Sequence, residues 1–156
     1  MFNKIKTVLE ANGIERIGII GIEHCEIINE RILPEWAKSV ITFCIPYRSK
    51  TEVANDGFSE YCRVYDYHKF SSQLYERLEN ELKYSITNNF KGFCDHSPIN
   101  EKLAIAMCGL GVIGKNSLYI DNVYGSFVFI GSIITDVEYN KPPFPVTECI
   151  NCGKCV

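Results

Sequence analysis

The stretch from Phe93 to Asp136 constrains the fold of this chain most, because glycines, turn residues and strand-like runs follow one another there without a spacer. Glycine adopts backbone conformations that other residues avoid, so the sequence GLGVIGK from Gly109 to Lys115 is expected to form a tight turn or a loop that a ligand approaches closely. The spacing to the lysine excludes a Walker-type phosphate loop, and a dinucleotide-binding fingerprint would follow a strand rather than a helix. A structural turn and a ligand-binding loop both remain open for this segment.

The pattern of hydrophobic residues predicts an α+β domain of three layers, with helices flanking a mixed or antiparallel sheet. Helices are expected at residues 2–11, 23–33, 67–86 and 100–108, and strands at 16–22, 39–45, 90–94, 117–120 and 127–135. Turn residues at 121–125 predict that the last two strands form a β-hairpin. Residues 48–60 carry no periodicity and are expected to form a long loop, a kind of segment that is often functional.

The composition fits one globular domain with a hydrophobic core. The chain has 156 residues, of which 46% are hydrophobic and 22% charged. Its net charge of −3 gives no strong positive field that would attract nucleic acid by itself. No apolar run approaches membrane-spanning length and the N-terminus lacks a signal-peptide core, so we expect a cytoplasmic protein with no membrane partner.

Three of the eight cysteines, Cys149, Cys152 and Cys155, have the spacing C-x-x-C-x-x-C. Cysteines this close cannot easily pair with one another, and the spacing is typical of ligands to a [4Fe-4S] cluster in a reducing compartment. The fourth ligand would lie beyond Val156, so the ligand set in this chain is incomplete. We expect a domain over residues 1–140, followed at 141–156 by a linker and the truncated start of a ferredoxin-like domain. A zinc knuckle is the alternative.

Two polar clusters are candidates for acid–base chemistry. Asp95 lies between an expected strand and an expected helix, and it could donate a proton if burial favoured its protonated form. The alternative is a turn or capping aspartate. The run Asp66-Tyr67-His68-Lys69 opens the longest expected helix, where it could equally be a solvated helix start.

Several motifs, in order along the chain, resemble those of the epoxyqueuosine reductase family, which comprises cobalamin-dependent iron–sulfur enzymes of tRNA modification. Arg63 with the run from Asp66 to Lys69 resembles the family's R-x-x-D-Y-H-K. Further matches are Asp95, Pro98 and Glu101 with D-x-x-P-x-x-E, Gly109-Leu110-Gly111 and Gly114-Lys115 with G-L-G-W-x-G-K, and Gly125-Ser126-Phe127 through Asp136 with G-S-W-F-F-L-G-E-x-x-T-D. The cysteine run then comes where the family's ferredoxin domain begins, so the resemblance covers residues 36–156.

The resemblance implies a nitroreductase-like cobalamin-binding fold and an oxidoreductase activity in the whole protein, with Asp95 as the general acid. It implies that the corrin lies near Tyr67, His68, Gly111, Lys115 and Ser126, and that Cys149, Cys152 and Cys155 ligate a cluster. The partners implied are tRNA and an electron donor such as a ferredoxin or flavodoxin. This chain alone is expected to be inactive.

The chain departs from the family pattern at three positions. Val112 replaces a tryptophan of the glycine motif, Met107 stands where a basic residue is common, and Ser132 replaces a glutamate after Gly131. The helical repeats with which family members hold tRNA are also absent from the sequence. A paralogue with another substrate is therefore an alternative, as is a non-catalytic cobalamin-binding or electron-transfer protein.

Overall fold

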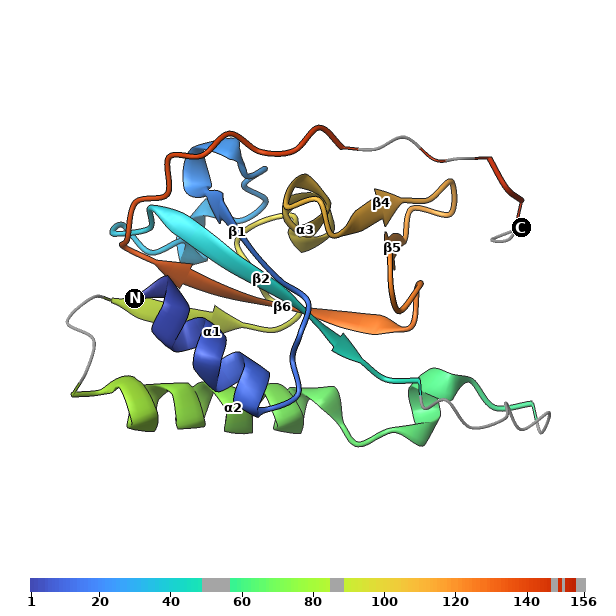
Figure 1. Ribbon diagram of the computed structural model, residues 1–156, viewed down its shortest axis with the longest axis horizontal. Helices are drawn as coiled ribbons and strands as arrows, with labels where there is room; N and C mark the ends of the chain where they lie inside the picture. Colours follow the sequence, from blue (N-terminus) through green and yellow to red (C-terminus); the bar gives the residue numbers. More distant parts are fainter. Residues whose placement is uncertain (49–56, 85–88, 147–148, 150, 154–156) are drawn as a thin grey trace.

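The computed structural model describes residues 1–48, 57–84, 89–146, 149 and 151–153. Its elements form three layers (Figure 1): α1 and α2 cover one face of a four-stranded sheet, and α3 lies on the opposite face. All strand pairs are antiparallel. The predicted fold class, an antiparallel sheet flanked by helices, is confirmed. Among the described residues, no helix has the length and apolar character that a membrane span requires.

The central strands β2 and β6 carry the sheet, whose order is β1-β2-β6-β3. They pair along their full length, from Ser39 opposite Thr135 to Pro46 opposite Val128. A separate two-stranded sheet contains β4 and β5. In chain order the helices and strands are α1 (Phe2–Ala11), β1 (Ile17–Gly21), β2 (Ser39–Pro46), α2 (Tyr67–Leu82), β3 (Phe90–Phe93), α3 (Glu101–Met107), β4 (Gly111–Ile113), β5 (Tyr119–Asp121) and β6 (Val128–Thr135), with short 3₁₀ turns η1 (Ile22–His24), η2 (Glu30–Ile32) and η3 (Glu60–Arg63).

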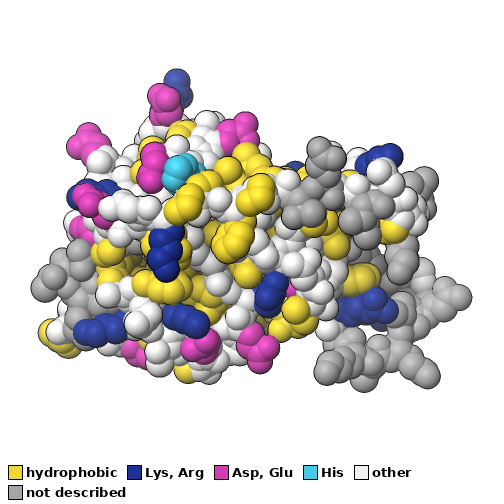
Figure 2. Space-filling view, turned by 45° about the horizontal axis from the view of Figure 1, so that its top comes forward, with side chains coloured by type: hydrophobic (Ala, Val, Ile, Leu, Met, Phe, Trp, Pro, Cys, Tyr) yellow, Lys and Arg dark blue, Asp and Glu magenta, His cyan; other side chains and the backbone are white. Residues whose placement is uncertain are grey.

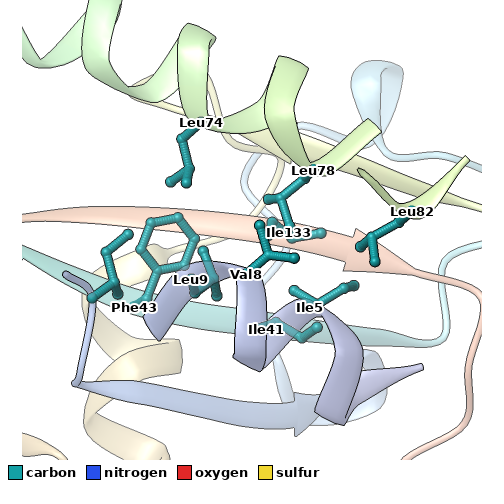
Figure 3. Close-up of a cluster of buried hydrophobic side chains, with 10 residues drawn as sticks. Ile5, Val8, Leu9, Ile41, Phe43, Leu74, Leu78, Leu82 and Ile133 are labelled. Atoms are coloured by element: carbon teal, nitrogen blue, oxygen red, sulfur yellow. The ribbon is translucent and has the colours of Figure 1, made fainter. Parts of the chain in front are cut away.

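The larger hydrophobic cluster lies between the sheet and the helices α1 and α2 (Figure 3). Side chains three or four residues apart on each helix reach the same face of the sheet, as the helical period requires. The buried members are Ile5, Val8, Leu9 and Ile14, Ile41 and Phe43, Leu74, Leu78 and Leu82, and Ile133. Gly131 faces Phe43 across the central pair, where a Cβ atom would lie 2.5 Å from the Phe43 ring. Glycine therefore makes room for the largest fully buried side chain.

The opposite face of the sheet holds α3. Val40 and Ile134 pack there with Ala104, while Cys44 packs with Ile105 and the β5 residue Tyr119, within a group that also includes Ala106. Successive β2 residues therefore point to opposite layers, because side chains alternate along a strand. Phe93, the last residue of β3, belongs to the same cluster as Ala104, so this packing holds the start of α3 beside the end of β3.

The helix predicted at residues 23–33 is wrong. The segment contains η1 and η2 instead, and its middle makes an isolated bridge between Ile27 and Ile99. The backbone N–H groups of Ile28 and Asn29 donate to the Pro98 carbonyl, at 2.8 and 3.1 Å, rather than to a preceding helical turn. The Asn29 side chain also accepts from the Arg31 N–H, a local bond that competes with helix formation.

The hairpin predicted from the turn at 121–125 is also wrong. β5 pairs with β4, so the glycine-rich segment itself supplies a strand, and β6 pairs with β2 and β3. The turn closes on itself because Asp121 Oδ1 accepts from the Val123 and Tyr124 N–H groups, at 2.8 and 3.0 Å. The long apolar run of β6 buries more hydrophobic surface in the centre of the sheet than it would if it paired with β5, its neighbour in sequence.

Two further expectations reach outside the described residues. The structure follows α2 only to Leu82, and Ile86, with which we expected the helix to continue, is not among the described residues. Of the predicted loop at 48–60, residues 49–56 are likewise outside them.

Candidate functional site

A cleft of about 420 Å³ lies between the first turn of α3, the start of α2 and the N-terminal half of β6. Its volume is in the range of small-molecule sites. Aromatic side chains and polar side chains share the lining, which includes Tyr61, Tyr67 and Phe129 together with Asp95, Ser97, Glu101 and Ser126. The cleft brings Asp95 and two of the predicted cofactor contacts, Tyr67 and Ser126, to one place.

Asp95 occupies a strained turn at the edge of this cleft. Its φ angle is +63°, in the left-handed region that most residues avoid. The His96 N–H donates to the Cys94 carbonyl at 2.8 Å, which closes a three-residue turn with Asp95 at its centre. A γ-turn with a positive φ is the rarer and more strained form, and such strain is concentrated at functional sites.

The Asp95 carboxylate is the end of a chain of hydrogen bonds that begins at the N-terminus of α2. Its Oδ2 atom accepts from the Tyr67 hydroxyl and lies 2.8 Å from His68 Nε2. The other ring nitrogen, His68 Nδ1, lies 3.0 Å from Asp66 Oδ1, which also caps the helix by accepting from the His68 N–H. The predicted polar run thus joins the predicted acid, since His68 contacts Asp95 directly.

These contacts shift the pKa values of the groups involved. The hydrogen bond to Asp66, followed by the contacts with Asp95, raises the pKa of His68. Burial, with the hydrogen bond to Asp95 next in size, raises the pKa of the Tyr67 hydroxyl. The His68 imidazole therefore holds its proton over a wider pH range, between two carboxylates, and Tyr67 stays a donor.

An aromatic wall separates the cleft from a second hollow of about 430 Å³. Tyr67 stacks on Phe129 with a centroid separation of 4.1 Å and an angle of 10° between the rings. Tyr61 meets the Phe129 ring edge-on at 5.4 Å, and both stacked rings line both hollows. Stacking of this kind provides a flat, rigid surface beside Asp95.

The remaining predicted cofactor contacts, His68, Gly111 and Lys115, are not among the residues that line the cleft. His68 reaches it only through Asp95, whereas Gly111 and Lys115 lie at the β4–β5 hairpin. Gly111 is buried, and a Cβ atom there would lie 2.2 Å from the Ile120 carbonyl oxygen, so the close pairing of the two strands requires glycine. Lys115 is exposed. The predicted contact of these three residues with a cofactor stays a prediction.

The C-terminal segment crosses the α3 layer toward this hairpin (Figure 1). The Phe144 N–H donates to the Met107 carbonyl at 2.8 Å. Further along, hydrogen bonds from the backbone N–H groups of Asn151 and Lys115 lower the pKa of the Cys149 thiol. A lowered pKa favours the thiolate, the form that binds metals.

The predicted cluster ligands are only partly described. Cys149 and Cys152 are among the described residues, whereas Cys155 lies outside them. Within the described ranges, no group of three or more His, Cys, Asp or Glu side chains is arranged to hold a metal ion. Ligation by the three cysteines stays a prediction.

Sequence reasoning missed Glu101 as a site residue. Its carboxyl group lines the cleft and accepts a hydrogen bond of 2.5 Å from the Ser132 hydroxyl. Burial raises the pKa of Glu101 to about 7, and the charge of Asp95 acts in the same direction. The signal that could have identified it was its place in the D-x-x-P-x-x-E pattern with Asp95.

The sequence is similar to proteins described as epoxyqueuosine reductases. Residues 28–96 match the family model described as "Epoxyqueuosine reductase QueG, DUF1730". The epoxyqueuosine reductase of Lactococcus garvieae is 30% identical over 148 residues, which cover 87% of this chain and 42% of that protein. The Escherichia coli enzyme is 35% identical over 101 residues, which cover 63% of this chain and 25% of the relative. The chain thus spans less than half the length of these relatives.

Solved structures share the fold. An epoxyqueuosine reductase crystallised with an epoxyqueuosine-modified tRNA stem loop has a TM-score of 0.75 at 19% identity, over 99% of this chain and 50% of that one. The Bacillus subtilis enzyme, described with an aspartate catalytic loop swung out of its active site, has a TM-score of 0.69 at 17% identity, over 99% and 49%. A reductive dehalogenase whose structure suggests a mechanism for B12-dependent dehalogenation has a TM-score of 0.64 at 10% identity, over 93% and 21%.

These likenesses agree with the order of motifs along the chain. The family model, the sequence relatives and the shared fold show that the chain belongs to the epoxyqueuosine reductase family.

Proposed function

We propose that this chain forms the cleft domain of an oxidoreductase that reduces an epoxide on a modified tRNA nucleoside. The observation that carries the proposal is the Asp95 carboxylate, which Tyr67 and His68 hold at the edge of an aromatic-walled cleft. Such an arrangement places a proton-carrying group where a ligand oxygen can reach it. Family membership supplies the reaction class, because the relatives named above are epoxyqueuosine reductases.

Asp95 is the proton donor in this proposal. A protonated His68 lies between Asp66 and Asp95, 3.0 Å and 2.8 Å from their oxygens, so it can return a proton to Asp95 once a turnover is complete. Tyr67 keeps the carboxyl group oriented through its hydroxyl. The Bacillus subtilis relative, whose catalytic loop carries an aspartate, supports this role by its description.

The residues present fit a large flat cofactor such as cobalamin. The stacked rings of Tyr67 and Phe129 form a planar wall. The cleft is open to solvent, so a large cofactor can lie across its mouth without entering it completely. Tyr67 and Ser126 would hold the corrin from the cleft side, with His68 as a predicted contact beside Asp95, and Gly111 and Lys115 as predicted contacts at the hairpin. When bound, the cofactor would supply the two electrons of the reduction. The B12-dependent dehalogenase with the same fold supports this cofactor.

Electrons would reach the site through an iron–sulfur cluster ligated in part by Cys149, Cys152 and Cys155, from a donor such as a ferredoxin or flavodoxin. The lowered pKa of Cys149 supports ligation by a thiolate. Metal analysis after anaerobic reconstitution of the whole protein separates this proposal from a zinc site. Iron with acid-labile sulfide is the expected result, and zinc without sulfide contradicts it.

The tRNA partner is proposed from the relative crystallised with a tRNA stem loop. With a net charge of −3, the chain offers no overall positive field, so contact with RNA has to rest on local features. Figure 2 shows one face on which hydrophobic side chains gather, with Lys and Arg side chains among them. A mixed surface of this kind suits unstacked bases as well as phosphates. A tRNA-modifying role would place the protein in the cytoplasm.

The variant Asp95→Asn in the whole protein tests the proposed function. The amide keeps the size of the side chain but cannot donate a carboxyl proton, so we expect epoxide reduction to fall by a factor of about 10² or more. Cofactor binding, followed by visible spectra, should be unchanged. The matched control is Glu81→Gln, which removes one exposed carboxylate from α2. Turnover by Asp95→Asn at the rate of the control contradicts the assigned role.

The cofactor proposal has its own test. Titration of the protein with oxidised and reduced cobalamin should change the visible spectrum of the corrin in at least one state, because its surroundings change from water to aromatic side chains. No spectral change in either state contradicts cobalamin binding, and with it the reaction proposed here.

A further inference from the structure

Glu101 is a second carboxyl group in the cleft and is held quite differently from Asp95. It is the first residue of α3, and its Oε1 atom accepts from the Ser132 hydroxyl of β6 at 2.5 Å. Ser132 Oγ lies 3.2 Å from Ser97 Oγ, and both serines are buried. The Ser132 hydroxyl thus holds the carboxyl group and is itself held by Ser97, while the Glu101 side chain still lines the cleft.

Among the described residues, no cation forms an ion pair with this carboxyl group: Lys102, which lines the same cleft, donates its ammonium group to the Ser117 carbonyl at 2.9 Å. The titratable groups that act on it or respond to it are Asp95 from the β3–α3 turn, Cys94 at the end of β3 and Tyr75 on α2, and none of these is a cation. The ion pairs found among the described residues do not include Glu101. Burial without a cation favours the protonated form, and the pKa of about 7 is consistent with this environment.

The chemistry of the proposed reaction requires two protons. Reduction of an epoxide takes up two electrons and two protons: one C–O bond breaks to give an alcohol, or both C–O bonds to the oxygen break to give an alkene and water. The two electrons come from the reduced cofactor of the proposed function. A single carboxyl group supplies one proton for each turnover unless it is recharged within the reaction.

We propose that Glu101 donates the second proton, to the ligand in the same cleft to which Asp95 donates the first. This inference rests on the proposed function and extends it to a residue with no role assigned above. The two carboxyl groups differ in environment. Asp95, at the exposed edge of the cleft, regains its proton from His68. Glu101 is partly buried and carries its own proton. The Glu101 carboxylate left after donation takes a proton from water, which reaches the open cleft.

The test uses the reconstituted whole protein and an epoxyqueuosine-modified tRNA stem loop, with single-turnover rates measured from about pH 5 to pH 9. The wild-type rate should fall as the pH rises through the neutral range, where Glu101 loses its proton. Glu101→Gln should slow the reaction about 10- to 100-fold and make the fall with pH shallower, since His68 still titrates in this variant. Ser132→Ala should move the fall to higher pH, because the Ser132 hydroxyl stabilises the ionised form of Glu101. Glu81→Gln is again the matched control.

A second readout does not depend on turnover. In protein with ¹³C-labelled glutamate side chains, one carboxyl signal should titrate near neutral pH in wild type and in Glu81→Gln, and be missing in Glu101→Gln. A Glu101 signal that titrates below about pH 5, close to an ordinary glutamate, overturns the inference.

The two proposals fail in distinguishable ways. An active wild-type enzyme whose rate and pH profile are unchanged in Glu101→Gln overturns the role of Glu101 and leaves the proposed function intact. A correctly reconstituted wild-type enzyme that does not reduce the epoxide contradicts the proposed function, and the second-proton role with it.

Discussion

At the scale of single residues, Asp66 has two separable effects. Its carboxylate caps α2 through the His68 N–H, and it also contacts the His68 ring. The cap is a property of any short side chain with an acceptor oxygen, whereas the effect on the ring requires a negative charge. Because the ring in turn contacts Asp95, the charge of Asp66 reaches the cleft, while the cap acts only on the helix.

Two variants of Asp66 should separate these effects. Asp66→Asn keeps a capping oxygen, so we expect a lower pKa of His68 and an unfolding midpoint that is unchanged at a pH where His68 is neutral. Asp66→Ala loses both effects, and should also lower the unfolding midpoint because the helix loses its cap. The His68 pKa by NMR and urea denaturation provide the two measurements. A pKa of His68 that is the same in wild type and Asp66→Asn contradicts the assigned cause.

The same contact predicts a sign for the pH dependence of stability. The pKa of His68 is higher in the folded state, so its contribution is complete below the unfolded pKa and is lost as the pH rises through the folded value. The wild-type protein should therefore lose stability across the neutral range more steeply than Asp66→Asn. Denaturant midpoints measured for both proteins on either side of neutral pH check this difference.

At the scale of elements, sequence reasoning succeeded where a local signal and the tertiary contacts agree. The bounds of α1 match the predicted range 2–11, and α3 lies within the predicted range 100–108, with the Asn100 side chain capping it by accepting from the Leu103 N–H. It failed where contacts distant in sequence decide the outcome. Residues 23–33 bond to the Pro98–Asn100 segment, and β6 pairs with strands far from it in the chain. No periodicity encodes such pairings.

The central strand pair gives a test of packing. In Gly131→Ala the new methyl group would lie 2.5 Å from the Phe43 ring, so one of the two has to move. We expect a loss of about 2 kcal/mol in the free energy of unfolding, typical of an overfilled core. Phe43→Leu alone should also destabilise, but the double variant should lose less than the sum, because the smaller side chain makes room for the methyl group. Strictly additive effects in denaturant melts contradict this account of Gly131.

At the scale of the whole molecule, one buried network attaches the β4–β5 hairpin to the main sheet. Arg16, just before β1, bonds to Asp121 at 3.1 Å and to the Leu110 carbonyl at 2.7 Å. Tyr119 donates to the same Asp121 oxygen at 3.1 Å. Because this hairpin precedes β6 in the chain, the network also positions the start of β6, which forms one wall of the cleft. The site therefore depends on residues that are far apart in the chain. Asp95 could be identified from its motif alone. The position of Glu101 in the cleft depends on contacts between elements, so the sequence could not predict it.

Asp121→Asn should weaken this attachment. Burial alone would raise the pKa of Asp121, but hydrogen bonds from the Tyr124 and Val123 N–H groups and the bond to Arg16 outweigh it and lower the pKa. The stabilisation is thus present above the unfolded pKa and is lost as the pH falls through the folded value. At neutral pH we expect a loss of about 2–3 kcal/mol, since the Arg16 side chain is partly exposed. The difference between variant and wild type should shrink in acid, and a constant difference would contradict the assigned ion pair.

The left-handed backbone at Asp95 also limits which substitutions evolution or a mutant library can sample there. Glycine, asparagine and aspartate tolerate a φ of +63° best, whereas glutamate, the nearest chemical equivalent, pays a steric cost to adopt it. Of the three tolerated residues only aspartate carries an acidic proton. A saturation library at this position should therefore yield well-folded variants that are inactive, and few active ones with a longer acid. The φ angle of this turn disfavours glutamate, and the proposed reaction requires an acid. The two requirements together leave aspartate as the residue that meets both.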